Sequence, residues 1–145
     1  MRETILLVDD DLFLLEIMKT VLEAGTGAQI LSFNQPEEAY SEVIRRNGDI
    51  QFIITDFHMP GLSGLELLMR IAKTYPGIPA CIASGDSEQV REKTSLYPIL
   101  DKGSTSFITS LVQLANELLD EKRKPGFEFH GHEHKHPSRQ RMLVF

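Results

Sequence analysis

The stretch that decides the fold is ILLVDDD, residues 5–11, in which a short apolar run is followed at once by three acidic residues. An uninterrupted run of branched and leucine side chains is typical of a central strand in a parallel sheet, because such a strand is covered on both faces. Residues 12–23 then place apolar side chains at helical spacing, and Gly25 is predicted to stop that helix. The stretch therefore predicts a strand, an acidic turn and a helix, with Asp11 as the helix cap.

The same alternation of short apolar runs and longer amphipathic segments continues along the chain. Strands are predicted at residues 4–8, 29–33, 52–55, 80–83 and, weakly, 99–100. Helices are predicted at residues 12–23, 36–46, 64–75, about 87–94 and 104–122, the last one capped by Ser104. Five alternating strand and helix pairs predict an α/β fold, doubly wound around a parallel sheet.

Composition limits the class of protein. A chain of 145 residues with 41% hydrophobic and 25% charged residues is expected to form one ordered domain. The net charge of −6 argues against nucleic acid binding through massed phosphate contacts. The single cysteine, Cys81, excludes an internal disulfide and is expected to be a buried strand residue. The sequence has no membrane-length apolar run and no signal-peptide pattern, so we expect no membrane insertion and a cytoplasmic location.

The composition changes near Lys124, which divides the chain into an expected domain, residues 1–124, and a flexible tail, residues 125–145. Histidines alternate with other residues at His130, His132, His134 and His136. Such spacing could gather imidazoles around Zn²⁺, Ni²⁺ or Cu²⁺. We favour the simpler interpretation, a polar tail that binds metals as weakly as any histidine-rich peptide.

Polar residues that suggest chemistry follow the predicted strands. Asp9 and Asp10 follow the first strand, Asp56 the third, Ser84 the fourth and Lys102 the fifth. In an open doubly wound sheet, ligands bind outside the carboxyl ends of the strands. These residues are therefore expected to share one edge of the sheet.

Three carboxylates at one edge repel each other, and a divalent cation would neutralise them. Oxygen ligands without a nearby thiolate or imidazole favour Mg²⁺, with Mn²⁺ as an alternative, and Mg²⁺ commonly binds phosphoryl ligands as well. Lys102 and Ser84 could then contact phosphate oxygens, and an ionised Asp56 could act as a nucleophile that forms an aspartyl phosphate. The structural alternatives are a turn role for Asp56 and Ser84, helix capping by the acids and a solvated Lys102.

Four segments in the right order and spacing carry a resemblance to a known family: ILLVDDD at 5–11, TDFHMPGLSG at 55–64, ASG at 83–85 and DKG at 101–103. Together they resemble the receiver domain of two-component response regulators over about residues 3–122. The resemblance implies a flavodoxin-like fold with five parallel strands in the order 2-1-3-4-5. It also implies a phosphoacceptor Asp56, acidic Mg²⁺ residues Asp9 and Asp10, a metal-binding backbone carbonyl at His58, a switch hydroxyl at Ser84 and a phosphate-binding Lys102.

The sequence departs from the family pattern around residues 87–103. Gly103 stands where the family usually has proline, often in a cis bond. Ile99 stands where the family often has tyrosine or phenylalanine, and Tyr97 is out of phase by two. The segment from Ser84 to Lys102 is also short, which predicts a trimmed helix.

The resemblance implies a signalling switch. Because no recognisable DNA-binding, zinc or enzyme module follows Lys124, we expect either a stand-alone receiver, as a monomer or weak dimer, or a receiver-containing piece of a longer protein. A histidine kinase or histidine phosphotransfer domain would phosphorylate Asp56, and phosphorylation would change binding to a downstream protein. The chain would catalyse its own phosphorylation and dephosphorylation without being a conventional turnover enzyme. Either Phe13 or Leu14 is expected to be exposed beside the acids and could contact the phosphodonor.

Two alternatives belong to other classes. One is a protein-interaction module that keeps the fold without phosphorylation. The intact acids, Ser84 and Lys102 argue against it, while Gly103, Ile99 and the short helix keep it open. The other is a phosphatase of the haloacid dehalogenase type, which would need a second aspartate two residues after the nucleophile. His58 occupies that position.

Overall fold

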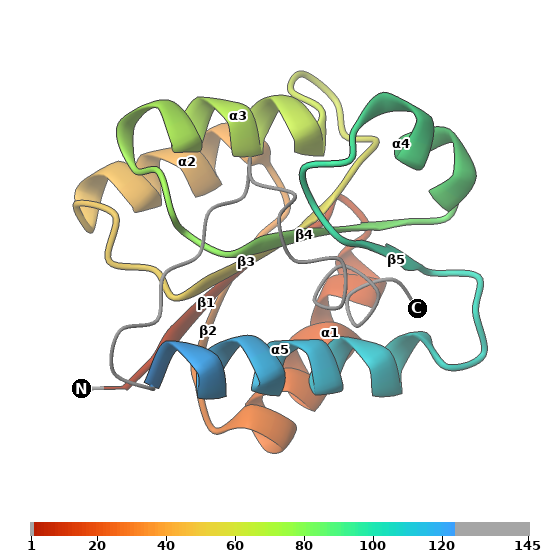
Figure 1. The fold of residues 1–145 in the computed structure, drawn as a ribbon, viewed down its shortest axis with the longest axis horizontal. Helices are drawn as coiled ribbons and strands as arrows, with labels where there is room; N and C mark the ends of the chain where they lie inside the picture. The colour runs from red at the N-terminus through yellow and green to blue at the C-terminus, as the bar shows by residue number, and fades with distance from the viewer. Residues whose placement is uncertain (1, 124–145) are drawn as a thin grey trace.

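The structure is a computed structural model that describes residues 2–123, and its strands and helices alternate along the chain (Figure 1). The strands are β1 (Thr4–Val8), β2 (Gln29–Phe33), β3 (Phe52–Asp56), β4 (Ala80–Ser84) and β5 (Ile99–Asp101). The helices are α1 (Leu12–Thr26), α2 (Pro36–Arg45), α3 (Gly64–Thr74), α4 (Ser87–Lys93) and α5 (Phe107–Arg123). The predicted histidine-containing tail lies outside the described residues.

All five strands are parallel, and their order is β2-β1-β3-β4-β5. Helices α1 and α5 cover one face of the sheet, and α2, α3 and α4 cover the other (Figure 1). This arrangement confirms the predicted doubly wound fold. The chain turns from one side of β1 to the other after β2, so the carboxyl ends of β1 and β3 lie next to each other at the switch in strand order.

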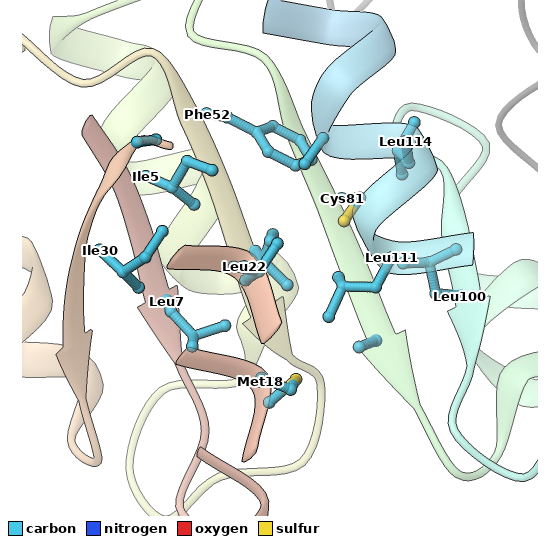
Figure 2. Close-up of a cluster of buried hydrophobic side chains, with 14 of the residues drawn as sticks. Ile5, Leu7, Met18, Leu22, Ile30, Phe52, Cys81, Leu100, Leu111 and Leu114 are labelled. Atoms are coloured by element: carbon cyan, nitrogen blue, oxygen red, sulfur yellow. The ribbon is translucent and has the colours of Figure 1, made fainter. Parts of the chain in front are cut away.

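Two apolar clusters fill the space between the sheet and its helices. Strands β1, β3 and β4 are buried at every position, and successive side chains point to opposite faces. On one face Ile5 and Leu7 pack with residues of α1 and α5, as Figure 2 shows. Cys81 lies in the same cluster, which confirms that it is a buried strand residue. The uninterrupted apolar runs in the sequence therefore reflect burial on both faces.

The end of α1 differs from the prediction. Gly25 does not stop the helix, which continues to Thr26 and ends at Gly27 in the left-handed conformation. A Cβ atom on Gly25 would lie 2.6 Å from a methyl carbon of Val112, so this glycine allows α1 and α5 to approach closely. The prediction was wrong because it treated as a helix stop a glycine whose role is packing.

The start of α5 also differs from the prediction. Ser104 lies in a turn, where its hydroxyl accepts a hydrogen bond from the Ser106 amide at 3.2 Å, and the helix begins at Phe107. The predicted cap of α1 is confirmed, because Asp11 Oδ1 accepts hydrogen bonds from the amides of Phe13 and Leu14. The predicted short fourth helix is also confirmed, since α4 has seven residues. None of the helices within residues 2–123 has both the length and the apolar character needed to cross a membrane.

Candidate functional site

The predicted site residues do come together at the carboxyl edge of the sheet. Asp9 directly follows β1, Asp56 ends β3, Ser84 ends β4 and Lys102 directly follows β5. The backbone amide of Lys102 donates to the carbonyl oxygen of Ser84 at 2.9 Å, which extends the contact between β4 and β5 beyond the last strand residue. The fold therefore brings together four segments that are far apart in the sequence.

Three carboxylates form a compact group at this edge. Asp9, Asp10 and Asp56 each offer one oxygen atom, and these atoms lie within 4.8 Å of one another. Asp9 and Asp56 are buried, whereas Asp10 is exposed. The group is therefore held by the core on one side and open to solvent through Asp10 on the other.

Lys102 supplies the positive charge within this group. Its Nζ atom lies 2.6 Å from Asp9 Oδ2 and 3.0 Å from Asp56 Oδ1. Burial would lower the pKa of Lys102, but the hydrogen bond to Asp9 and the charges of Asp56 and Asp9 outweigh it, so the pKa is raised above its usual value. Lys102 therefore stays an ammonium ion. The sequence predicted its place at this edge but not that it bridges two carboxylates.

The pKa of Asp56 is raised, although an ion pair with a lysine would by itself lower it. The pKa of this carboxyl group is raised to about 6, because burial and the negative charge of Asp9 raise it by more than the charge of Lys102 lowers it. At neutral pH most molecules therefore carry Asp56 as a carboxylate. A carboxylate oxygen is the form that can attack an electrophilic phosphorus atom.

Local contacts hold the Asp56 segment in place. The Phe57 amide donates to Asp56 Oδ1, and the Thr55 hydroxyl donates to the Asp56 carbonyl oxygen, each at 2.9 Å. Gly64, the first residue of α3, lies so close that a Cβ atom there would be 2.0 Å from the Asp56 carbonyl oxygen. The glycine at the end of the TDFHMPGLSG segment is thus explained by a backbone approach that no other residue allows.

The three consecutive acids after β1 have different roles. Asp9 Oδ1 accepts from the amide of Asp11 at 2.9 Å, while Asp9 Oδ2 faces Lys102. Asp11 caps α1, and Asp10 completes the acidic group from the solvent side. Capping and cation attraction are therefore divided among neighbouring residues and do not compete.

Ser84 is 1% exposed, and its hydroxyl oxygen accepts a hydrogen bond from the Asp86 amide at 3.0 Å. This contact is the turn role that the sequence allowed, while a contact with a phosphoryl group on Asp56 stays a prediction. Beside it, a Cβ atom on Gly85 would meet no atom within 4 Å. The structure thus has open space on the side-chain side of Gly85, the residue that follows Ser84.

The donor atoms of the acidic group suit a hard divalent cation. All three are carboxylate oxygens, and the group contains no thiolate or imidazole, which fits Mg²⁺ or Mn²⁺ better than Zn²⁺. His58 follows on the loop after β3, with an exposed side chain whose ring meets the Phe57 ring edge-on at 4.8 Å between centroids. Its backbone carbonyl as a metal ligand stays a prediction.

The structure shows where the residues around β5 that depart from the family pattern lie. No peptide bond within residues 2–123 is cis, so the bond before Gly103 is trans. Ile99 is buried in the core beneath α3 and α4. Tyr97 packs against the same cluster, and its burial raises the pKa of its hydroxyl. The aromatic ring in this region therefore belongs to Tyr97, and the strand position itself is aliphatic.

Helix α1 presents apolar side chains to solvent directly beside the acidic group. Phe13 is 76% exposed and Leu12 is 65% exposed, while Leu14 packs against the core. The prediction that one of Phe13 and Leu14 is exposed is therefore confirmed. Ile17, one helical turn after Phe13, extends this patch.

Comparisons with known proteins agree with the geometry. The family model for the response regulator receiver domain matches residues 5–109. A putative two-component response regulator of Arabidopsis thaliana, ARR21, is 30% identical over 95 residues, which cover 66% of this chain and 15% of that protein. A chemotaxis protein CheY homolog of Campylobacter jejuni is 29% identical over 94 residues, covering 63% of this chain and 72% of that protein.

Solved structures show the same fold. A CheY-like response regulator receiver domain protein from Methanospirillum hungatei superposes with a TM-score of 0.73 at 25% identity, covering 87% of this chain and all of that one. The receiver domain of the hybrid histidine kinase CckA gives a TM-score of 0.67 at 25% identity, with coverage of 80% and 98%. By contrast, the chain spans only 15 to 33% of the length of the first three curated relatives.

Proposed function

The chain belongs to the response regulator receiver domain family, and from this premise we propose that it is a phosphorylation-dependent signalling switch. A phosphohistidine of a histidine kinase or histidine phosphotransfer domain would be the phosphodonor, and Asp56 the acceptor. Phosphorylation would change the affinity of the chain for a downstream protein. The observation that carries the proposal is the buried Asp56 carboxylate, which lies 3.0 Å from Lys102 within a group of three acids.

In the proposed transfer, an Asp56 carboxylate oxygen attacks the phosphorus atom in line with the bond to the imidazole nitrogen. The new O–P bond forms as the P–N bond breaks, and the imidazole nitrogen keeps the electron pair and takes up a proton. The Lys102 ammonium group, already at the Asp56 oxygen, would contact an oxygen of the incoming phosphoryl group. Attack of water on the same phosphorus atom would later break the bond between the Asp56 oxygen and phosphorus, release inorganic phosphate and return Asp56 to its carboxylate form.

The residues fit a Mg²⁺ ion held by Asp9, Asp10 and Asp56, with the backbone carbonyl of His58 as a further oxygen ligand. Bound there, Mg²⁺ would supply positive charge that offsets the negative charge of the acids and of the phosphoryl oxygens. Lys102 already compensates Asp9 and Asp56 from within the core. The exposed Asp10 leaves the solvent side of the group open to a cation.

The proposed switch uses the turn after β4. A phosphoryl group on Asp56 adds negative charge and strong acceptor oxygens at the edge where Ser84 lies. The Ser84 hydroxyl can donate its hydrogen to such an oxygen, and the turn from Ser84 to Asp86 would then shift because it is tied to the same hydroxyl. A change in this turn would alter the surface of the short helix α4, which follows directly.

We place the phosphodonor contact on the exposed patch formed by Leu12, Phe13 and Ile17 of α1. The patch begins directly after the acids, so a partner helix packed on it would bring its histidine toward Asp56. We further propose that the domain comprises residues 1–124, that the chain is a monomer or weak dimer, and that it acts in the cytoplasm.

The proposal is tested by incubating the chain with Mg²⁺ and acetyl phosphate and resolving the product on a phosphate-affinity gel. We expect a retarded, hydroxylamine-sensitive species that requires Mg²⁺ and is missing from Asp56→Asn. Asp49→Asn is the matched control, because Asp49 is an exposed acid at the opposite edge of the sheet. If the wild-type chain gives no such species, the switch is wrong and an interaction module that does not depend on phosphorylation is favoured.

A further inference from the structure

The turn that carries Lys102 is held by a side chain that has no part in the proposed chemistry. Strand β5 ends at Asp101, which is paired with Ser84 of β4. The carboxylate Oδ1 of Asp101 accepts a hydrogen bond from the Gly103 amide at 2.8 Å, and its backbone carbonyl accepts one from the Ser104 amide at 3.1 Å. Asp101, directly before Lys102, therefore closes the turn by binding the amides of the two residues that follow Lys102.

We propose that Asp101 is a positioning residue for Lys102. Its carboxylate fixes the peptide group after Lys102, so that the ammonium group is held at both acids before a phosphodonor arrives. This inference rests on the proposed role of Lys102 in phosphoryl transfer.

Lys102 contacts two carboxylates with one ammonium group, which requires its backbone to be held in place. One Nζ atom satisfies Asp9 Oδ2 and Asp56 Oδ1 at the same time, at 2.6 and 3.0 Å. A lysine side chain is flexible and loses rotamer freedom when it is held at one point. The Lys102 amide is tied to Ser84, and the bond from Gly103 to Asp101 fixes the peptide on the other side. With the backbone held at both peptides, only the side-chain torsions remain to be set.

Gly103 gives a second, independent argument for this bond. Among the described residues, the glycines in the left-handed conformation are at positions 27, 48, 61 and 77, so the backbone at Gly103 does not itself require glycine. A Cβ atom on Gly103 would lie 3.3 Å from Asp101 Oδ1, closer than ordinary van der Waals contact. Glycine at position 103 thus leaves room for the Asp101 carboxylate to reach the amide. An aspartate that accepts from the amide two residues later is a recognised way to fix a turn.

The experiment compares Asp101→Ala, which removes the acceptor, with Asp101→Asn, which keeps an acceptor oxygen and removes the charge. Asp49→Ala is the matched control. Its carboxylate also accepts a hydrogen bond, in this case from the Gln51 side chain, but it lies at the opposite edge of the sheet. The rate of Asp56 phosphorylation is measured against acetyl phosphate concentration at saturating Mg²⁺. We expect the maximal rate to fall about tenfold in Asp101→Ala, because small misplacements of a reacting group are costly. Asp101→Asn and Asp49→Ala should stay within about twofold of wild type, and the concentration for half-maximal rate should change little in any variant.

A second measurement separates this inference from the proposed function. In the protein without phosphodonor, NMR of the lysine ammonium groups should show a slowly exchanging Lys102 signal in wild type and Asp101→Asn, and its loss in Asp101→Ala. If the wild-type chain is not phosphorylated, the proposed function fails while this signal still tests the positioning. If Asp101→Ala keeps both the wild-type rate of Asp56 phosphorylation and the wild-type Lys102 signal, the inference is overturned. Equal impairment of the Asn and Ala variants would also overturn it, because charge would then matter and not the hydrogen bond.

Discussion

At the scale of single residues, Gly64 sets how closely α3 approaches the end of β3, which carries Asp56. A Cβ atom at this position would lie 2.0 Å from the Asp56 carbonyl oxygen, so Gly64→Ala must displace either the helix or the strand end. Forcing extra volume into a packed site usually costs about 1–3 kcal/mol. We expect Gly64→Ala to lower the free energy of unfolding by about that amount in urea and to slow phosphorylation of Asp56.

Gly85 provides the control for this change. It also borders the site, but a Cβ atom there meets no atom within 4 Å, and its backbone is not in the left-handed region. Gly85→Ala should therefore change the free energy of unfolding by less than about 0.5 kcal/mol. Equal stabilities of the two alanine variants would show that the close approach of Gly64 to Asp56 is relaxed at little cost.

At the scale of elements, α3 depends on a reciprocal cap at its start. The Ser63 hydroxyl accepts from the Glu66 amide at 3.1 Å, and the Glu66 carboxylate accepts from the Ser63 amide at 3.0 Å. Ser63→Ala should lower the free energy of unfolding by about 1 kcal/mol, because two amides at the helix start lose or weaken their partner. Ser63→Asp, which keeps an acceptor, should recover most of the loss in the same urea titration. A wild-type midpoint for Ser63→Ala would contradict this role.

Helix α2 carries an ion-pair cluster whose contribution should depend on pH. Hydrogen bonds from Arg45 and Arg46 lower the pKa of Glu42 from its usual 4.5 to about 2. The folded state therefore holds fewer protons than the unfolded state between these values. The stabilisation is present above about pH 4.5 and is lost as the pH falls toward 2. Because the Arg45 side chain is 67% exposed, we expect only about 0.5–1 kcal/mol from this cluster.

Glu42→Gln tests this expectation. Urea unfolding at pH 7, 5 and 3 should show a gap between wild type and variant that is full at pH 7 and shrinks at pH 3. Glu16→Gln, an exposed change on α1, should show little gap at any pH. A gap for Glu42→Gln that stays constant from pH 7 to 3 would mean that Glu42 acts through packing and not through its charge.

The elements also show what the sequence could and could not predict. Strand positions were predicted to within about a residue, because runs such as residues 4–8 are apolar for a single reason, burial on both faces. The end of α1 was wrong because Gly25 packs against Val112, which is distant in the sequence. The start of α5 was wrong because the Ser104 hydroxyl bonds within a turn before the helix begins. Helix ends of this kind depend on contacts that local patterns do not contain.

At the scale of the whole molecule, the strand order decides which predicted site residues meet. The sequence placed Asp9, Asp56 and Lys102 at strand ends, but their mutual distances depend on the order β2-β1-β3-β4-β5. The ends of β1 and β3 are neighbours, while β5 lies two strands away from β3, and the long side chain of Lys102 spans that distance. The bridge formed by Lys102 could therefore not be predicted from residue spacing alone.

Because the acidic group is assembled only in the folded molecule, we expect Mg²⁺ to stabilise the folded state. The acidic group exists only when β1 and β3 are paired, so a cation that binds it favours the folded state. At a Mg²⁺ concentration about 100-fold above the dissociation constant, linkage gives about 2.7 kcal/mol. The midpoint temperature of thermal unfolding of the wild type should therefore be higher in Mg²⁺ than in EDTA.

Asp10→Asn should lose most of this shift, while its midpoint in EDTA should change little, since Asp10 is exposed and the buried contacts of Lys102 remain. Asp49→Asn should keep the full shift, and a wild-type midpoint that is the same in Mg²⁺ and EDTA would show that the acids hold no cation.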